Sequence, residues 1–210
     1  MTSSYAVRAF ASFLVLGTLV ADLSLAQPNE VEIVHIDPSQ IQTLVVPPWE
    51  RPTNDETRAW ENSVRASVTD EFGGDFRKAA GAAANKGFQA LDELDFASAS
   101  KAFSEAAVLD PKSPYPYIGF VGIYRLMYQL EKKEFCLQAA IDRSERQKAA
   151  LIMIGAHLGI DGDYWKAVEF FNSVLELDAK DQGAHLMLAK TYRLLKDSER
   201  AEYHEQRAKE

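Results

Sequence analysis

The sequence contains one cysteine and four histidines, and so has few of the residues that redox, zinc and nucleophilic centres often use. Its single cysteine, Cys136, allows no internal disulfide and no cysteine-pair zinc site. Neither a phosphate-binding glycine loop nor a Gly-x-Ser-x-Gly nucleophile motif occurs. No metal-ligand spacing joins the histidines, which are His35, His157, His185 and His204. We therefore expect no catalytic residues, no metal and no cofactor, and we interpret Cys136 as a small apolar residue of the interior.

Positive charge is also scarce. Lysine and arginine number 23 against 31 aspartate and glutamate residues, which gives a net charge of −8. Nucleic acid is therefore not an expected partner, because phosphate binding needs a concentrated positive surface. Many of the carboxylates, as in ELDAKD, fall between predicted helices, where we interpret them as helix caps rather than acid/base pairs. Hydrophobic residues make up 47% of the chain, which favours a folded protein.

The first 26 residues are typical of a secretory signal peptide. Arg8 precedes an apolar run over residues 9–21, and the small residues Ser24 and Ala26 stand just before a possible cleavage site. The run is shorter than the roughly 20 residues that span a bilayer. We expect residues 1–26 to be removed and the chain to be exported, with the bacterial periplasm as the preferred location. A leader that is retained as a membrane anchor is the alternative.

Two different segments follow the leader. Residues 27–54 contain several prolines and two β-rich apolar patches, and they are predicted to form an extended tail or linker. Residues 55–79 are predicted to hold an N-terminal helix with an apolar stripe at spacing four, followed by a break at the Gly73-Gly74 pair. The stripe consists of Trp60, Val64 and Val68.

The remainder of the chain, residues 80–210, repeats one helical pattern. Asp95, Ala99 and Phe103 recur as Asp163, Ala167 and Phe171, at two intervals of about 34 residues. This period divides the region into four units, which are 80–113, 114–147, 148–181 and 182–210. The second unit fits least well, because it has Lys133 where the others have a small residue.

The pattern resembles the tetratricopeptide repeat, a helix–turn–helix unit with the motif W-x2-L-G-x2-Y, then A-x3-F, then P. The matching positions of the first unit hold Gly87, Ala99, Phe103 and Pro111. The resemblance implies an all-α fold, namely a right-handed superhelical solenoid of about four units. Each helical hairpin would bury its apolar face against the next, because it cannot bury that face alone.

The resemblance also implies a concave surface lined by the first helix of each unit. Carried over residue by residue, it places these side chains there: Phe88, Tyr115, Ile118, Arg125, Ile152, Leu186, Lys190 and Arg193. The surface is expected to be apolar in the middle and positive towards the last unit. A strip of this kind marks a contact surface, or it is covered by neighbouring side chains or by the tail. The lysine and asparagine set with which some family members bind a terminal carboxylate is absent.

Three hypotheses for function follow. The first is a non-catalytic binding module, scaffold or assembly factor, of the bacterial cell envelope that holds a segment of another exported protein. The second is a self-associating structural protein whose tail, around residues 31–46, occupies the groove of its own chain or of a second copy. The third is a small-ligand carrier or enzyme accessory with a pocket where the tail crosses the groove.

Overall fold

The computed structural model describes residues 6–9, 32–35 and 46–210. The chain divides into two compact units, which we describe separately. Unit 1 contains the described residues up to Ala139, and unit 2 contains those from Ala140 to Glu210. The predicted cleavage site and most of the predicted tail lie outside the described residues.

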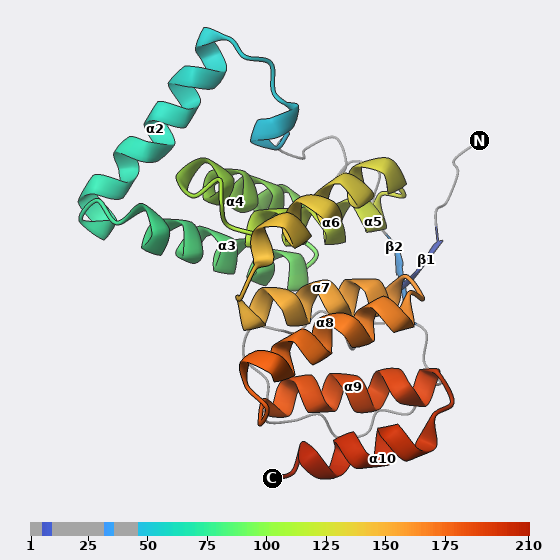
Figure 1. Cartoon of the computed structure of the whole chain (residues 1–210). Coiled ribbons are helices and arrows are strands. Elements are labelled where there is room, and N and C mark those ends of the chain that lie inside the picture. Colours follow the sequence, from blue (N-terminus) through green and yellow to red (C-terminus); the bar gives the residue numbers. More distant parts are fainter. Residues whose placement is uncertain (1–5, 10–31, 36–45) are drawn as a thin grey trace. The chain divides into compact units, whose positions relative to one another are not determined.

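Helices form nearly all of the described structure, so the prediction of an all-α fold is confirmed (Figure 1). A short 3-10 helix, η2, covers Pro48–Glu50. The helices of unit 1 are α2 (Asp55–Phe72), α3 (Phe76–Asp92), α4 (Phe96–Leu109), α5 (Tyr115–Leu126) and α6 (Leu130–Ser144), the last of which continues into unit 2. Unit 2 goes on with α7 (Lys148–Ile160), α8 (Tyr164–Leu177), α9 (Gln182–Leu194) and α10 (Ser198–Arg207).

Two short strands pair near the N-terminus. Strand β1 (Ala6–Ala9) runs antiparallel to β2 (Glu32–His35), with Ala6 opposite His35 and Ala9 opposite Glu32. Strand β1 belongs to the predicted leader and β2 to the predicted tail. An isolated pair of strands is marginally stable in water, so removal of the leader would take away little of the stability of the helices.

Side-chain caps mark the start of five of the described helices. Asn54 accepts a hydrogen bond of 2.8 Å from the backbone N–H of Thr57 and so caps α2. Asp75, Asp95, Asp181 and Asp197 cap α3, α4, α9 and α10 in the same way. The interpretation of these carboxylates as caps is confirmed. Because Asp75 starts α3 at Phe76, the helix begins before residue 80, where the repeat was predicted to start.

Glycine ends the N-terminal helix as predicted. Gly73 and Gly74 have φ values of 59° and 85°, in the left-handed region that glycine adopts without a steric penalty. The predicted stripe is also present, since Val64 and Val68 are buried and Trp60 is partly buried. Helix α2 therefore packs on α3 and α4 through one narrow face.

Glycine and phenylalanine let neighbouring helices approach closely in both units. A Cβ atom added to Gly87 of α3 would lie 2.5 Å from Cε1 of Phe103 in α4, and Gly119 of α5 lies against the same ring. In unit 2 a Cβ on Gly155 of α7 would lie 2.6 Å from Cε1 of Phe171 in α8. The two phenylalanine rings are almost completely buried. Equivalent positions of the predicted repeat thus make equivalent contacts.

The same left-handed turn recurs at the repeat interval along the chain. In this turn the residue with positive φ is Leu94 (59°), Tyr128 (56°), Gly162 (85°) or Lys196 (60°). After each of them, a backbone N–H donates to the carbonyl five residues back; the pairs are Asp95 to Ala90, Gln129 to Tyr124, Asp163 to Leu158 and Asp197 to Tyr192. This bond from the residue after the left-handed position is typical of a Schellman helix end. It also occurs after α5, in the repeat that the sequence matched least well.

Candidate binding surface

Two of the predicted surface residues pack against the same cluster in unit 1. Phe88 of α3 and Tyr115 of α5 are partly buried and pack against one alanine cluster, formed by Ala83, Ala84 and Ala106. Burial raises the pKa of the Tyr115 hydroxyl. These two aromatic side chains therefore combine a packing role with some exposed surface.

Ile118 does not line an exposed strip, contrary to the prediction. Its side chain has no exposed surface, because α5 is apolar around its circumference and is buried continuously from Pro116 to Tyr124. A helix of this composition presents no single solvent-facing stripe. Arg125 lies in the last turn of α5 and is partly buried. Its charge is favourable at the negative end of the helix dipole.

In unit 2 the predicted residues lie where α7 meets α9. Ile152 of α7 packs against the cluster of Leu151, Val174 and Ala184. A Cβ on Gly183 of α9 would lie 3.8 Å from Cδ1 of Ile152, so the two helices are in close contact at this point. Leu186, one turn further along α9, is also partly buried. Ile152 and Leu186 are thus the two apolar residues of the predicted set in unit 2, and both are partly buried.

The positive part of the face is weaker than predicted. Burial lowers the pKa of Lys190, which is partly buried on α9. Arg193 binds Glu205 of α10, with Nε 2.6 Å and Nη2 2.5 Å from Oε1. This ion pair compensates the charge of Arg193, and a partner carboxylate would have to compete with Glu205. We call Ile152, Leu186 and Lys190 the α7–α9 face.

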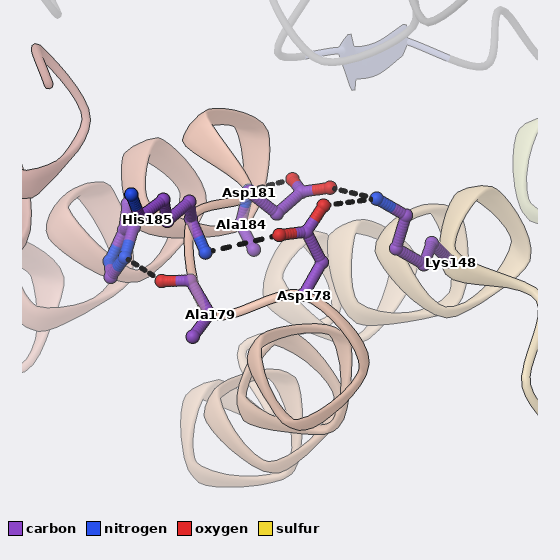
Figure 2. Close-up of polar contacts among 7 residues, drawn as sticks. Lys148, Asp178, Ala179, Asp181, Ala184 and His185 are labelled. Atoms are coloured by element: carbon purple, nitrogen blue, oxygen red, sulfur yellow. Dashed lines mark hydrogen bonds and ion pairs between the residues drawn. The ribbon is translucent and has the colours of Figure 1, made fainter.

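A cluster of charged residues connects the start of α7 to the turn between α8 and α9 (Figure 2). Lys148 Nζ lies 2.8 Å from Asp178 Oδ2 and 3.0 Å from Asp181 Oδ2. Hydrogen bonding to Asp178 and then Asp181 raises the pKa of Lys148, and the bond from Lys148 lowers the pKa of Asp178. The sequence pattern did not identify this pairing. A lysine in the first turn of a helix interacts unfavourably with the helix dipole. The position of Lys148 is therefore the feature of the sequence from which acidic partners could have been predicted.

Two buried histidines join the last two helices. The Nδ1 atoms of His185 in α9 and His204 in α10 are 2.8 Å apart. His185 Nε2 lies 3.2 Å from the carbonyl oxygen of Ala179 (Figure 2). If His185 Nε2–H donates to Ala179, its Nδ1 accepts from His204. The ring of Tyr192 stacks on His204 with a centroid distance of 5.6 Å. The pair therefore has a structural role in the terminal hairpin.

Residues 47–51, which belong to the predicted extended linker, instead pack on the helices of unit 1. Pro47 is buried, and the indole of Trp49 stacks on Tyr117 with a centroid distance of 4.3 Å. Glu50 accepts a hydrogen bond from the hydroxyl of Tyr124. The guanidinium of Arg51 lies 3.6 Å from the ring centroid of Trp60. Sequence periodicity carries no information about such an irregular segment, so this contact was missed.

A cavity of about 360 Å³ opens between α2, α3 and α4 in unit 1. Its apolar lining includes Val64, Val68 and Ala83, and it is also lined by charged residues of both signs. These charged residues are Glu71, Lys86, Lys101 and Glu105. The mixed lining offers no converging set of reactive groups.

The described residues contain no group of three or more His, Cys, Asp or Glu side chains placed to hold a metal ion. Cys136 is completely buried, and burial, followed by the nearby Glu50, raises the pKa of its thiol to about 12. Its predicted place in the interior is confirmed. Within the described part of the chain, no helix is long and apolar enough to cross a membrane.

No protein-family model matches the chain, and a search of the curated proteins finds no match either.

Proposed function

We propose that the chain is a non-catalytic protein-interaction module built from four tetratricopeptide-like units, and that it binds a segment of another exported protein in the bacterial cell envelope. The main support for this proposal is the recurrent left-handed turn. The helices end in the same way at Leu94, Tyr128, Gly162 and Lys196. The Gly–Phe contacts in α3–α4 and α7–α8 support the same repeat. Arrays of such hairpins form extended binding surfaces.

The partner-binding residues that we propose are those with exposed surface. They include the α7–α9 face, together with Phe88 and Tyr115 in unit 1. The apolar side chains of Ile152 and Leu186 would contact apolar residues of the partner, and Lys190 would contact an acidic one. Ile118 is excluded from this set because it is buried.

Site-specific photo-crosslinking in the source cell tests this function. A crosslinker at position 186 should capture one protein reproducibly, and capture should be lost when Lys190→Glu is added. A crosslinker at Trp165, which is 55% exposed on α8, provides the matched control. The captured protein is then purified and its affinity measured for the wild type and for Lys190→Glu. Equal affinity of the two folded forms would remove the α7–α9 face from the proposal.

Export is tested separately by the mass of the protein in the periplasmic fraction. We expect a chain that begins at Gln27. A full-length chain that remains with the membrane would contradict cleavage and support the retained anchor.

A second candidate function is self-association through the N-terminal tail. The packing of Trp49 and Glu50 on unit 1 favours it, because these two residues belong to the C-terminal part of the predicted tail and contact the helices of this chain. Light scattering of a chain without residues 27–53 tests it against the wild type. The same monomeric mass for both chains at all concentrations would contradict self-association.

A further inference from the structure

Three aromatic rings of unit 1 surround the side chain of Trp49. The indole lies nearly parallel to Tyr117, with an interplanar angle of 16°, and meets Phe120 edge-on at a centroid distance of 5.3 Å. Phe135 of α6 adds a third ring at 6.5 Å. Stacked and edge-on pairs are the arrangements that aromatic rings prefer. Helices α5 and α6 therefore provide a well-matched binding place for one aromatic side chain.

A carboxylate is bound directly beside the indole. The two oxygens of Glu50 have different partners, since Oε1 accepts from Tyr124 Oη at 2.5 Å and Oε2 lies 2.5 Å from Lys132 Nζ. Burial, and then the bond to Glu50, raise the pKa of Tyr124, so its hydroxyl remains a proton donor. Charge-assisted bonds of this kind are stronger than those between neutral groups. The same surface thus recognises an acid that follows the aromatic residue.

The bound segment has the properties of a docked peptide. Its backbone hydrogen bonds are internal, from Glu50 N–H to Pro47 and from Arg51 N–H to Pro48. The two prolines favour an extended approach to the turn. Proline-flanked segments that dock on aromatic side chains are a recurrent mode of peptide recognition, because little conformational entropy is lost on binding.

The fit of this segment is incomplete. The indole N–H of Trp49 is buried without a hydrogen-bond partner, which is unfavourable for a polar group removed from water. A competing segment whose aromatic side chain leaves no donor unpaired would avoid this penalty. Such a segment would have an advantage over the segment of this chain in competition for the same surface.

We propose that this surface is a peptide-binding site for proline-flanked segments in which an aromatic residue directly precedes a carboxylate. Residues 46–51 occupy it until a partner segment of this chemistry displaces them. The site, which we call the aromatic-acid site, consists of Tyr117, Phe120, Tyr124, Lys132 and Phe135. It is separate from the α7–α9 face, so the proposal does not depend on the function proposed above.

A labelled peptide with the sequence of residues 45–53, VVPPWERPT, tests the site by fluorescence anisotropy. The full chain carrying Trp49→Ala and Glu50→Gln has a vacant site and should bind the peptide. The wild type should bind it at least tenfold more weakly, because its own segment competes at an effective concentration on the order of millimolar. Peptides with alanine for tryptophan, or glutamine for glutamate, should lose at least tenfold in affinity for the vacant site.

A folded vacant-site variant that binds no peptide would overturn the proposal, and so would equal binding of the alanine peptide. A second measurement does not depend on the folding of this variant. In a chain with Trp60→Phe and Trp165→Phe, Trp49 is the only tryptophan, and an excess of the unlabelled peptide with phenylalanine in place of its own tryptophan should increase the quenching of Trp49 by iodide. Unchanged quenching at saturating peptide would overturn displacement.

Sedimentation distinguishes a second copy of this chain from a separate partner. A wild-type dimer that forms at high concentration and is abolished by Trp49→Ala would identify a second copy as the occupant and would overturn the proposal of a separate partner. A wild type that stays monomeric supports the proposal.

Discussion

Replacing Gly87 with alanine tests the closest helix contact of unit 1. The new methyl group would lie 2.5 Å from Cε1 of Phe103, which is too close for two carbon atoms without a shift. The phenylalanine ring has no exposed surface and also lies against Gly119, so it has little room to move. Overpacking of a buried site costs about 1–3 kcal/mol, and alanine recovers about 1 kcal/mol of helix propensity. We expect a net loss of up to about 2 kcal/mol in the free energy of unfolding.

Gly81 provides the matched control on the same helix. It is exposed, and a Cβ atom added there would have no neighbour within 4 Å. Gly81→Ala should therefore raise the free energy of unfolding by roughly 0.5–1 kcal/mol through backbone entropy alone. Urea titrations of the two variants and the wild type give the comparison, provided that the m-values agree.

A double-mutant cycle with Phe103→Leu identifies the cause of the loss. If the clash with the ring is responsible, the cost of Gly87→Ala should decrease by at least about 1 kcal/mol in the Phe103→Leu background. A Gly87→Ala variant as stable as Gly81→Ala would refute the packing argument. A cost that is unchanged in the Phe103→Leu background would show that the ring is not its origin.

Three further predictions concern unit 2. Burial, and then the neighbouring His185, lower the pKa of His204. Below the ordinary value of about 6.5 the unfolded chain therefore binds the proton more readily than the folded chain, and stability falls as the pH falls. The urea midpoint should decrease less between pH 7.5 and 5 for His204→Gln than for the wild type, and an equal decrease would contradict this. Asp181→Ala removes the cap of α9 and one partner of Lys148, and should cost about 1 kcal/mol, whereas an unchanged thermal midpoint would show that the cap is dispensable. Lys196→Gly relieves a positive φ of 60° and should raise the free energy of unfolding by about 1 kcal/mol, measured by urea titration, and a loss would contradict strain at this turn.

Periodicity predicted the parts of the fold that depend on neighbouring residues in the sequence. Helix α2 has the predicted stripe and ends at the predicted glycines, because both features are local. Small residues next to large ones predicted the approach of α7 and α8, where Gly155 lies against Phe171. Ala167 is completely buried, as its place in the pattern requires.

The candidate site was harder to predict, because exposure depends on what covers a helix. The position of Ile118 in the repeat predicted a surface residue, but an apolar helix such as α5 can be covered on every side. The charge of Arg193 predicted a positive patch, but Glu205 comes from another helix and compensates it. The contact of Trp49 with Tyr117 joins residues that are distant in the sequence, and one of them lies in a segment without periodicity.

The recurrent left-handed turn makes the chain divisible at equivalent points. If residues 163–196 were deleted, Gly162 would be followed directly by Asp197. The turn would keep its backbone hydrogen bond, because Asp163 and Asp197 both donate to the carbonyl five residues back. Whole repeats can therefore be duplicated or excised in evolution or by engineering without a new loop geometry. The number of helical hairpins, and with it the extent of the binding surface that we propose, is a property that recombination at these turns can adjust.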